Sequence, residues 1–248
     1  MLELKNINTI INNEYMGIQI IEIENPNLFL AQMFEYEYQT DSGSILLNSR
    51  ETFISECYLL SNLTKANELY NFTSKNILYK TFIEDSHFDP EAILLANLIN
   101  EYCEQYNLKF ANNLLDFNLD KIKLLKAIIN INDNLLINKN ILFKWLESSK
   151  NSTKQTIILN NFDNIKLKEL LKHTNSFNFI LFTNNMWKYC SDWDDLEACS
   201  FYYKNEFISF QDINLLKTFI FQQFPGISFE TLASDFDIQN RIKKLLIQ

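Results

Sequence analysis

Three oxygen-bearing side chains stand at alternate positions of one short segment, at Asp116, Asn118 and Asp120. In an extended loop, alternate side chains point to the same side, so these groups would converge there. Carboxylate and amide oxygens are the ligands that calcium prefers. The segment is not an EF-hand, because Lys121 stands where that loop needs glycine and Ala127 where it needs a bidentate glutamate. Two predictions stay open: a calcium site, or an Asx-rich turn in which Asp120 caps the following helix.

Lysine supplies most of the positive charge, with 20 lysines against two arginines. Each lysine group predicts a solvated helix face or, where two faces line a channel in a symmetric oligomer, a track for DNA phosphates. Lysine lacks the bidentate fork with which arginine reads guanine, so any DNA binding should be insensitive to sequence. The groups are Lys121, Lys123 and Lys126; Lys144, Lys150 and Lys154; Lys166, Lys168 and Lys172; and Lys243 and Lys244.

Two enzyme classes lack the residues that they need. Gly17, Gly43 and Gly226 stand alone, whereas a phosphate-binding loop requires a motif such as GxxxxGK(S/T), so we expect no ATP hydrolysis. The two histidines, His87 and His173, are expected in a turn and after a helix, where a surface role is more common than triad catalysis. We predict a protein that is not an enzyme.

The composition is that of a folded protein with a substantial core. Of 248 residues, 47% are hydrophobic and 14% aromatic, which argues against disorder. The net charge of −9 counts against DNA binding only if the lysines are spread evenly. No apolar run approaches the roughly 18 residues that span a bilayer, and no signal peptide is expected. The four cysteines form no CxxC pair, so we expect a reduced, cytoplasmic protein without a zinc cluster.

A strand, a helix and a second strand are predicted over residues 155–185. The apolar runs are residues 156–159 and 177–183, and the helix over 166–172 places Ile165, Leu167, Leu170 and Leu171 on one side. Such a unit belongs to a parallel, helix-covered sheet, which binds ligands beyond the carboxyl ends of its strands. Both strand ends are rich in asparagine, at Asn160, Asn161, Asn184 and Asn185.

The remaining elements alternate between strand and helix patterns. We predict a strand ending near residue 24, a strand at 45–48, an ambiguous segment at 50–60, and a short strand at 207–208. Helices are predicted over 28–38, 65–138 with a turn at 85–89, 140–149, and from 212 onward. The helix over 28–38 begins at Pro26, and its predicted buried face is Leu28, Phe29, Ala31, Gln32, Met33 and Tyr36.

Several segments in this order resemble one protein family. They are IIEIENPNLFLAQMFEYEY from Ile20, TDSGSILLN, TSKNILYKTFIEDSHFDPEAILLANLINEY, TIILNN and FILFTNN. The chain resembles the Csn-two family, the type II-A CRISPR adaptation accessory proteins that work beside the Cas-nine effector and the spacer integrase. The resemblance covers roughly residues 20–210 and depends on the order of elements rather than on a catalytic motif.

The resemblance implies an α/β head, built like a P-loop ATPase domain with a degenerate nucleotide site, and an inserted α-helical leg. We expect the head in residues 1–60 and 140–210, the leg in 61–139, and a C-terminal helical extension in 211–248. It further implies a homotetrameric ring that threads double-stranded DNA from its ends, with calcium between head and leg. It places calcium near Asp116, Asn118 and Asp120. The channel residues do not carry over one by one, and we select Lys144, Lys150 and Lys154 as candidates.

The resulting prediction is a non-catalytic ring that binds double-stranded DNA without sequence preference and assists CRISPR spacer acquisition. Its predicted partners are DNA ends, the CRISPR integrase and the type II effector nuclease. One alternative is a protein-interaction module without DNA binding, whose acidic, aromatic-rich surface docks a partner. A further alternative is a degenerate nucleotide-binding enzyme. A measurement that finds ATP binding would favour this alternative.

Overall fold

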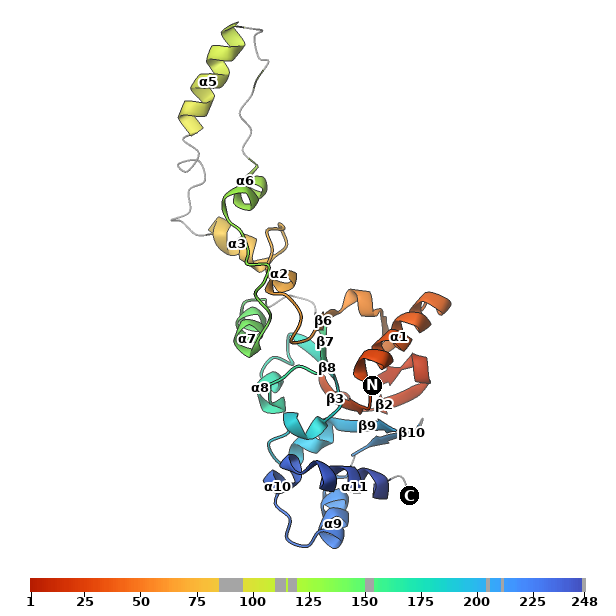
Figure 1. The fold of residues 1–248 in the computed structure, drawn as a ribbon. Helices are drawn as coiled ribbons and strands as arrows, with labels where there is room; N and C mark the ends of the chain where they lie inside the picture. The colour runs from red at the N-terminus through yellow and green to blue at the C-terminus, as the bar shows by residue number, and fades with distance from the viewer. Residues whose placement is uncertain are drawn as a thin grey trace. The chain divides into compact units, whose positions relative to one another are not determined.

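The computed structural model describes residues 1–84, 96–109, 115, 120–149, 154–203, 206–210 and 212–246. The chain divides into two compact units. We call Met1–Thr64 together with Ile137–Gln248 the sheet unit, and Lys65–Leu136 the helical unit. The helical unit is therefore an insertion within the sequence of the sheet unit. Figure 1 shows the elements that form each of them.

A six-stranded sheet is the centre of the sheet unit, with the strand order β10-β9-β3-β8-β7-β6. The strands from β9 to β6 run parallel, and β10 is antiparallel to β9 at one edge. The predicted α/β class is therefore confirmed as a mixed fold with a largely parallel sheet. The strands are β3 (Ile18–Ile23), β6 (Tyr58–Leu60), β7 (Gln155–Asn160), β8 (Phe177–Thr183), β9 (Cys199–Tyr203) and β10 (Glu206–Ser209).

The three central strands are the most deeply buried part of this sheet. Every residue of β3 is buried, and β7 and β8 are buried along most of their length. A strand covered on both faces carries a continuous apolar run, which is why the sequence identified β7 and β8. Helix α7 (Lys139–Ser148) precedes β7, and α8 (Leu167–Leu171) connects β7 to β8. One residue of the predicted buried helix face differs, because Leu171 is 43% exposed.

A second sheet of four short antiparallel strands, in the order β2-β1-β4-β5, forms near the N-terminus. Residues 1–24 thus contain three strands rather than the one predicted, and the ambiguous segment at 50–60 contains two. Strands of three or four residues are too short for a hydrophobic period to identify. The elements are β1 (Leu2–Leu4), η1 (Lys5–Ile7), β2 (Thr9–Asn12), β4 (Ile45–Leu47), β5 (Arg50–Thr52) and η2 (Ile54–Glu56).

Helix α1 (Pro26–Thr40) begins at the predicted proline, and its predicted buried face is confirmed at Phe29 and Met33 but wrong at three other positions. Leu28 is 56% exposed, and Ala31 and Gln32 are exposed as well. Apolar residues lie on both sides of this helix, so their spacing alone could not select the face. The buried residues are Pro26, Phe29, Leu30, Met33 and Glu37.

The carboxylate of Glu37 helps to fix which face of α1 is buried. One of its oxygens accepts hydrogen bonds from the backbone N–H of Ser44 at 3.0 Å, the Ser44 hydroxyl at 2.5 Å, and the Ile54 N–H at 2.9 Å. A buried carboxylate must be compensated by such donors. These three bonds therefore tie α1 to the start of β4 and to η2.

The helical unit contains α2 (Ala66–Leu69), α3 (Ile77–Glu84), α5 (Ala96–Lys109) and α6 (Lys121–Ile128). Its two ends meet in an isolated antiparallel bridge between Lys65 and Leu136. The Ala66 N–H also donates to the Leu135 carbonyl at 2.8 Å. The turn predicted at residues 85–89, which includes His87, lies outside the described residues.

The chain after β8 forms strands β9 and β10 and the last helices of the sheet unit. It contains η3 (Met186–Tyr189), η4 (Asp194–Ala198), α9 (Ile213–Gln223), α10 (Phe229–Ser234) and α11 (Phe236–Leu246). Helices α9 to α11 gather beside β9 and β10 in Figure 1. The Trp193 ring packs edge-on against Phe221 and Phe229, with centroid distances of 5.5 and 5.4 Å.

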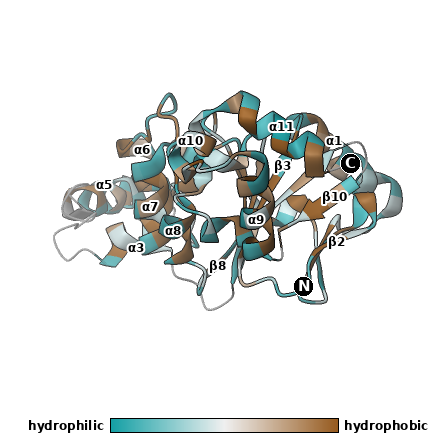
Figure 2. Ribbon diagram, turned by 90° about the horizontal axis from the view of Figure 1, so that it is seen from below, coloured by the Kyte–Doolittle hydropathy of each residue, from teal (hydrophilic) through white to brown (hydrophobic). Residues whose placement is uncertain are grey.

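Helix α11 is amphipathic, and its ribbon carries both hydrophilic and hydrophobic residues in Figure 2. Its buried residues are Gln239 and Ile242. Residues 212–246 belong to the sheet unit by their contacts. Within the described part of the chain, no helix has the length and apolar character needed to cross a bilayer.

Candidate functional site at the carboxyl edge of the parallel sheet

The connection from β3 to α1 lies at the edge of the sheet where α/β proteins bind ligands. It consists of Glu24 and Asn25 alone. The Asn25 side chain accepts a hydrogen bond from the Leu28 N–H at 3.1 Å, and Pro26 has no N–H to offer. The first turn of α1 is therefore capped by its own chain. A phosphate cradle needs several free N–H groups in a longer loop, and this connection cannot form one.

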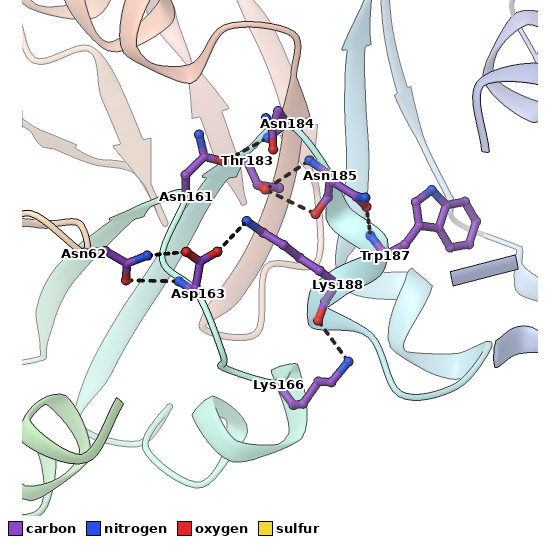
Figure 3. A network of polar contacts seen from close by, with 9 residues as sticks. All are labelled: Asn62, Asn161, Asp163, Lys166, Thr183, Asn184, Asn185, Trp187 and Lys188. Atoms are coloured by element: carbon purple, nitrogen blue, oxygen red, sulfur yellow. Dashed lines mark hydrogen bonds and ion pairs between the residues drawn. The ribbon is translucent and has the colours of Figure 1, made fainter. Parts of the chain in front are cut away.

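Asparagines follow the next two strands, β7 and β8, and fasten the strand ends to each other (Figure 3). The Asn161 N–H donates to the Phe182 carbonyl at 2.8 Å, and its side-chain oxygen accepts from the Asn184 N–H at 3.1 Å. Asn161 has a φ of 45°, in the left-handed region that asparagine tolerates better than most residues. The asparagine-rich ends of β7 and β8 thus lie side by side, and the two hydrogen bonds of Asn161 hold their backbones together.

Asp163 joins three segments at the same edge, as Figure 3 shows. Its carboxylate accepts from the Asn62 amide and, at 3.2 Å, from the Lys188 ammonium. Its N–H donates to the Asn62 side-chain oxygen at 3.2 Å. The Lys166 ammonium donates to the carbonyls of Lys188 and Cys190, at 2.9 Å each. Both lysines are therefore engaged within the protein, and their contacts are structural.

A cavity of about 460 Å³ opens at the carboxyl ends of β3 and β9, next to α11. The chain passes here from β8 across β3 to β9, so the cavity lies at the switch point of the strand order. Its walls include aromatic side chains of β9 and Phe236 of α11. The polar residues that line it are Glu22, Glu24, Asn184, Asn185, Asn240 and Lys243.

A buried ion pair joins α11 to β3 in the wall of this cavity. The Lys243 ammonium contacts one oxygen of Glu22, and the other oxygen accepts from the Met186 N–H at 2.9 Å. The two side chains are 16% and 7% exposed. Burial raises the pKa of Glu22, although Lys243 and the Met186 N–H oppose that shift. With Glu24, the walls carry two carboxylates against one ammonium, which disfavours anionic ligands.

Of the predicted calcium ligands, only Asp120 lies among the described residues; Asp116 and Asn118 lie outside them. Asp120 is the N-cap of α6, and its Oδ1 accepts from the N–H groups of Ile122 at 3.0 Å and Lys123 at 3.1 Å. These bonds, that of Lys123 first, lower the pKa of Asp120. The capping prediction is confirmed. Calcium stays a prediction, and it would compete with the Lys123 ammonium, which lies 3.5 Å from Oδ2.

Two of the three predicted DNA-binding lysines, Lys144 and Lys154, are among the described residues. Lys144 is exposed on α7, Lys154 directly precedes β7, and Lys150 lies outside the described residues. A Cβ atom at Gly17 would lie 3.0 Å from the Lys154 ammonium, which therefore sits over the start of β3. Partial burial lowers the pKa of Lys154. Neither Lys144 nor Lys154 pairs with a carboxylate of the described chain.

Several other lysines are neutralised within the protein, which spacing along the sequence could not show. Carboxylate partners are Asp192 for Lys168, Asp194 for Lys217, Glu169 for Lys139, Asp163 for Lys188 and Glu22 for Lys243. The count of lysines therefore overstates the charge available to DNA. Sequence reasoning also missed the Glu22 pair, whose only local signal is one carboxylate inside the apolar strand IQIIEI.

Comparisons with known proteins identify a fold. No protein-family model matches this chain, and no curated protein matches it. Among solved structures, the crystal structure of Stu0660 of Streptococcus thermophilus matches with a TM-score of 0.51 and 13% identity. The match covers 86% of this chain and 76% of Stu0660. This chain is therefore similar in fold to Stu0660.

Proposed function

We propose that this chain belongs to the Csn-two type and forms a non-catalytic homotetrameric ring that binds double-stranded DNA by threading its ends. In this proposal it assists CRISPR spacer acquisition in the cytoplasm, together with the integrase and the type II effector nuclease. The observation that carries the proposal is the two-residue connection between β3 and α1. A head related to P-loop ATPases would bind nucleotide at this connection, and here the Asn25 side chain caps the helix and Pro26 offers no N–H.

The order of elements also supports the proposal. The resemblance implies a head interrupted by a helical leg, and the helical unit is inserted between β6 and β7. The sequence segments that carry the resemblance include β3 with α1, β7 and β8. Residues 212–246 follow the segment that the resemblance covers, and Lys243 among them contacts Glu22 of β3.

Lys144 and Lys154 are the candidate contacts to DNA phosphates because no carboxylate among the described residues pairs with them. DNA responds to the local potential, so such lysines repeated around a ring would bind it despite the net charge of −9. The lowered pKa of Lys154 reflects partial burial, and a nearby phosphate would stabilise the charged form of this ammonium. Backbone contacts of this kind carry no sequence information.

The test compares a linear duplex with a closed circle of the same sequence, each with calcium or chelator, across a salt series. The proposal expects calcium-dependent binding of the linear form alone, with an affinity that falls steeply with salt. If the folded protein binds neither the linear nor the circular duplex, the proposal is refuted. Binding of the circle with equal affinity would refute end threading.

A matched pair of double variants tests the choice of lysines. Lys144→Gln with Lys154→Gln should weaken DNA binding. The slope of the logarithm of the binding constant against the logarithm of the salt concentration should become shallower by about 0.9 for each phosphate that is no longer neutralised. Lys168→Gln with Lys217→Gln removes the same charge from lysines that already have carboxylate partners, so it should change binding little. Equal decreases in affinity for both variants would show that only net charge matters.

Calcium is tested separately, because Asp120 also caps a helix. Asp120→Asn keeps a good capping residue but removes the charge, whereas Asp120→Ala removes both. If calcium binds at Asp116, Asn118 and Asp120, then Asp120→Asn should abolish calcium binding measured by calorimetry and should weaken the tetramer in sedimentation. Unchanged calcium affinity in both Asp120→Asn and Asp116→Asn would remove the site.

The alternative function, a protein-interaction module, is favoured by the outer face of α1. Leu28, Phe34 and Tyr38 on this face are exposed, Tyr38 by 92%. Exposed aromatic residues are common at protein interfaces. This function would be indicated by a folded protein that binds no DNA and loses a partner protein when Phe34 and Tyr38 are replaced by serine.

A further inference from the structure

Two buried cysteines lie in contact at the amino end of β9, where the chain enters this strand from the loop after β8. The sulfur atoms of Cys190 and Cys199 are 3.5 Å apart, and both residues are at most 1% exposed. Cys190 follows η3, and Cys199 is the first residue of β9. Each thiol also lies 3.6 Å from the carbonyl oxygen four residues earlier, of Met186 and Asp195 respectively. The two thiols are thus held at adjacent ends of one short loop.

We propose that Cys190 and Cys199 are an oxidation site that forms an intramolecular disulfide under peroxide stress. A disulfide has a sulfur–sulfur bond of about 2.05 Å, so the two sulfur atoms must approach by roughly 1.5 Å from their present contact. A rotation about the two Cα–Cβ bonds, with a small shift of the loop between them, can supply that approach. No sequence pattern indicates this pair, because the cysteines are nine positions apart and match no CxxC motif.

The reaction balances with a peroxide as oxidant. One thiolate attacks hydrogen peroxide, its sulfur takes the hydroxyl group as a sulfenic acid, and the O–O bond breaks to release water after proton uptake. The second thiol then attacks the sulfenic sulfur. The S–S bond forms, the S–O bond breaks, and a second water leaves with the thiol proton. Two thiols lose two electrons in total, and one peroxide gains them.

Burial controls the rate of this reaction. It raises the pKa of Cys199 well above that of a free thiol, and the neighbouring Cys190, Glu22 and Asp195 act in the same direction. The Cys199 thiolate is therefore scarce while the loop is closed. Opening of the loop that contains η4 would expose both sulfur atoms. The ion pairs that hold this loop, Lys168 with Asp192 and Lys217 with Asp194, lie at the surface and are weak.

The disulfide would fix the loop that supports the C-terminal helices. Between the two cysteines, Trp193 packs against Phe221 and Phe229, and the loop aspartates pair with lysines of α8 and α9. A cross-link that closes so short a loop removes freedom mainly from the unfolded chain. We expect the oxidised protein to melt about 5 °C higher than the reduced protein.

The other two cysteines provide internal controls. Cys57 lies in the sheet unit and Cys103 in the helical unit, and both are free and partly buried. Burial raises the pKa of Cys57 to about 12, so little of this thiol is ionised at neutral pH either. Neither has a described cysteine as a hydrogen-bond partner. If oxidation followed burial or chance collision alone, these residues would react as readily as the pair.

Tryptic mapping gives a direct test on the intact chain. Cleavage after Lys188 and Lys204 places Cys190 and Cys199 in one peptide, while Cys57 and Cys103 fall in two others. The native protein is treated with hydrogen peroxide, then denatured, alkylated without reductant and digested. The proposal expects the 189–204 peptide to lose both alkyl groups and about 2 Da, with recovery after reduction. Cys57 and Cys103 should remain fully alkylated.

A parallel treatment in urea below the unfolding midpoint opens the loop without unfolding the protein. Full alkylation of the 189–204 peptide in both treatments, or cross-links from it to Cys57 or Cys103, would overturn the proposal. Single variants Cys190→Ala and Cys199→Ala should abolish the mass loss and the rise in melting temperature. If either variant still melts higher after peroxide treatment, the rise does not come from this disulfide and that part of the proposal fails.

Discussion

Replacing Lys243 by methionine removes one member of the ion pair that joins α11 to β3. Methionine keeps an unbranched apolar chain of similar length, so packing along the stem is largely preserved. The Glu22 carboxylate, 7% exposed, would then keep the Met186 N–H as its remaining partner. The variant therefore measures the cost of a buried, unpaired carboxylate with little change in shape.

The expected loss at neutral pH is about 3 kcal/mol, at the low end of the range for breaking a buried pair. The low end applies because Glu22 can take up a proton instead of remaining charged. For a chain of this size the loss corresponds to a decrease of roughly 6–12 °C in melting temperature. Glu22→Gln should cost less, because the Lys243 ammonium is 16% exposed and can reach water. Combining the two substitutions should recover part of the loss.

The loss should grow with pH. Burial raises the folded-state pKa of Glu22 above its ordinary value of 4.5. Below 4.5 the Glu22 carboxyl is protonated in both the folded and unfolded states. Folding then buries a neutral group, and the contribution of Glu22 to the free energy of unfolding is fully present. That contribution is lost as pH rises through the folded-state pKa. Removing Lys243 raises this pKa further, so the deficit of Lys243→Met relative to wild type should be small near about pH 5 and largest near about pH 8.

Urea denaturation of wild type, both single variants and the double variant, at about pH 5 and about pH 8, provides the measurement. Each free energy of unfolding is compared with that of wild type at the same pH, because other groups also titrate. A deficit for Lys243→Met that is below about 1 kcal/mol and equal at both pH values would refute the reasoning. A larger cost for Glu22→Gln than for Lys243→Met would also refute it.

Three further outcomes follow from individual contacts. Glu37→Ala leaves three donors without their acceptor and should cost about 3 kcal/mol in urea denaturation, whereas Glu37→Gln, which keeps an acceptor oxygen, should cost less. Gly43→Ala should lower the melting temperature more than Gly226→Ala, since a Cβ at Gly43 would lie 2.6 Å from a backbone oxygen, whereas at Gly226 a Cβ meets open space and the cost is only the strain of a φ of 75°; equal shifts would contradict this. Asp120→Ala should reduce hydrogen-exchange protection in the first turn of α6 without calcium, and Asp120→Asn should preserve it.

Long periodic segments could be predicted from the sequence because their pattern is local. The continuous apolar runs of β7 and β8 reflect burial on both faces, and α7 lies within one residue of its predicted bounds. Pro26 marked the start of α1, and Asp120 was correctly considered as a cap. The four-stranded sheet was missed because its strands have three or four residues.

The exposed face of α1 and the charge state of the lysines could not be predicted in the same way. The buried side of α1 depends on Ser44 and Ile54, which bond to Glu37 from outside the helix. The pairing of Lys168 and Lys217 depends on aspartates of the η4 loop, 24 and 23 positions away. Lys144 and Lys154 can be separated from these paired lysines only once the carboxylates have been placed.

The sequence by itself determined the α/β class, the absence of a glycine-rich phosphate loop, and the asparagine-rich ends of two neighbouring strands, because these properties belong to short stretches of chain. Only the tertiary structure decided that Glu22 meets Lys243, that Cys190 touches Cys199, and that Asp163 holds Lys188. Each of these contacts depends on which strands become neighbours in the sheet. Strand order is fixed by the packing of the whole unit, and no local pattern encodes it.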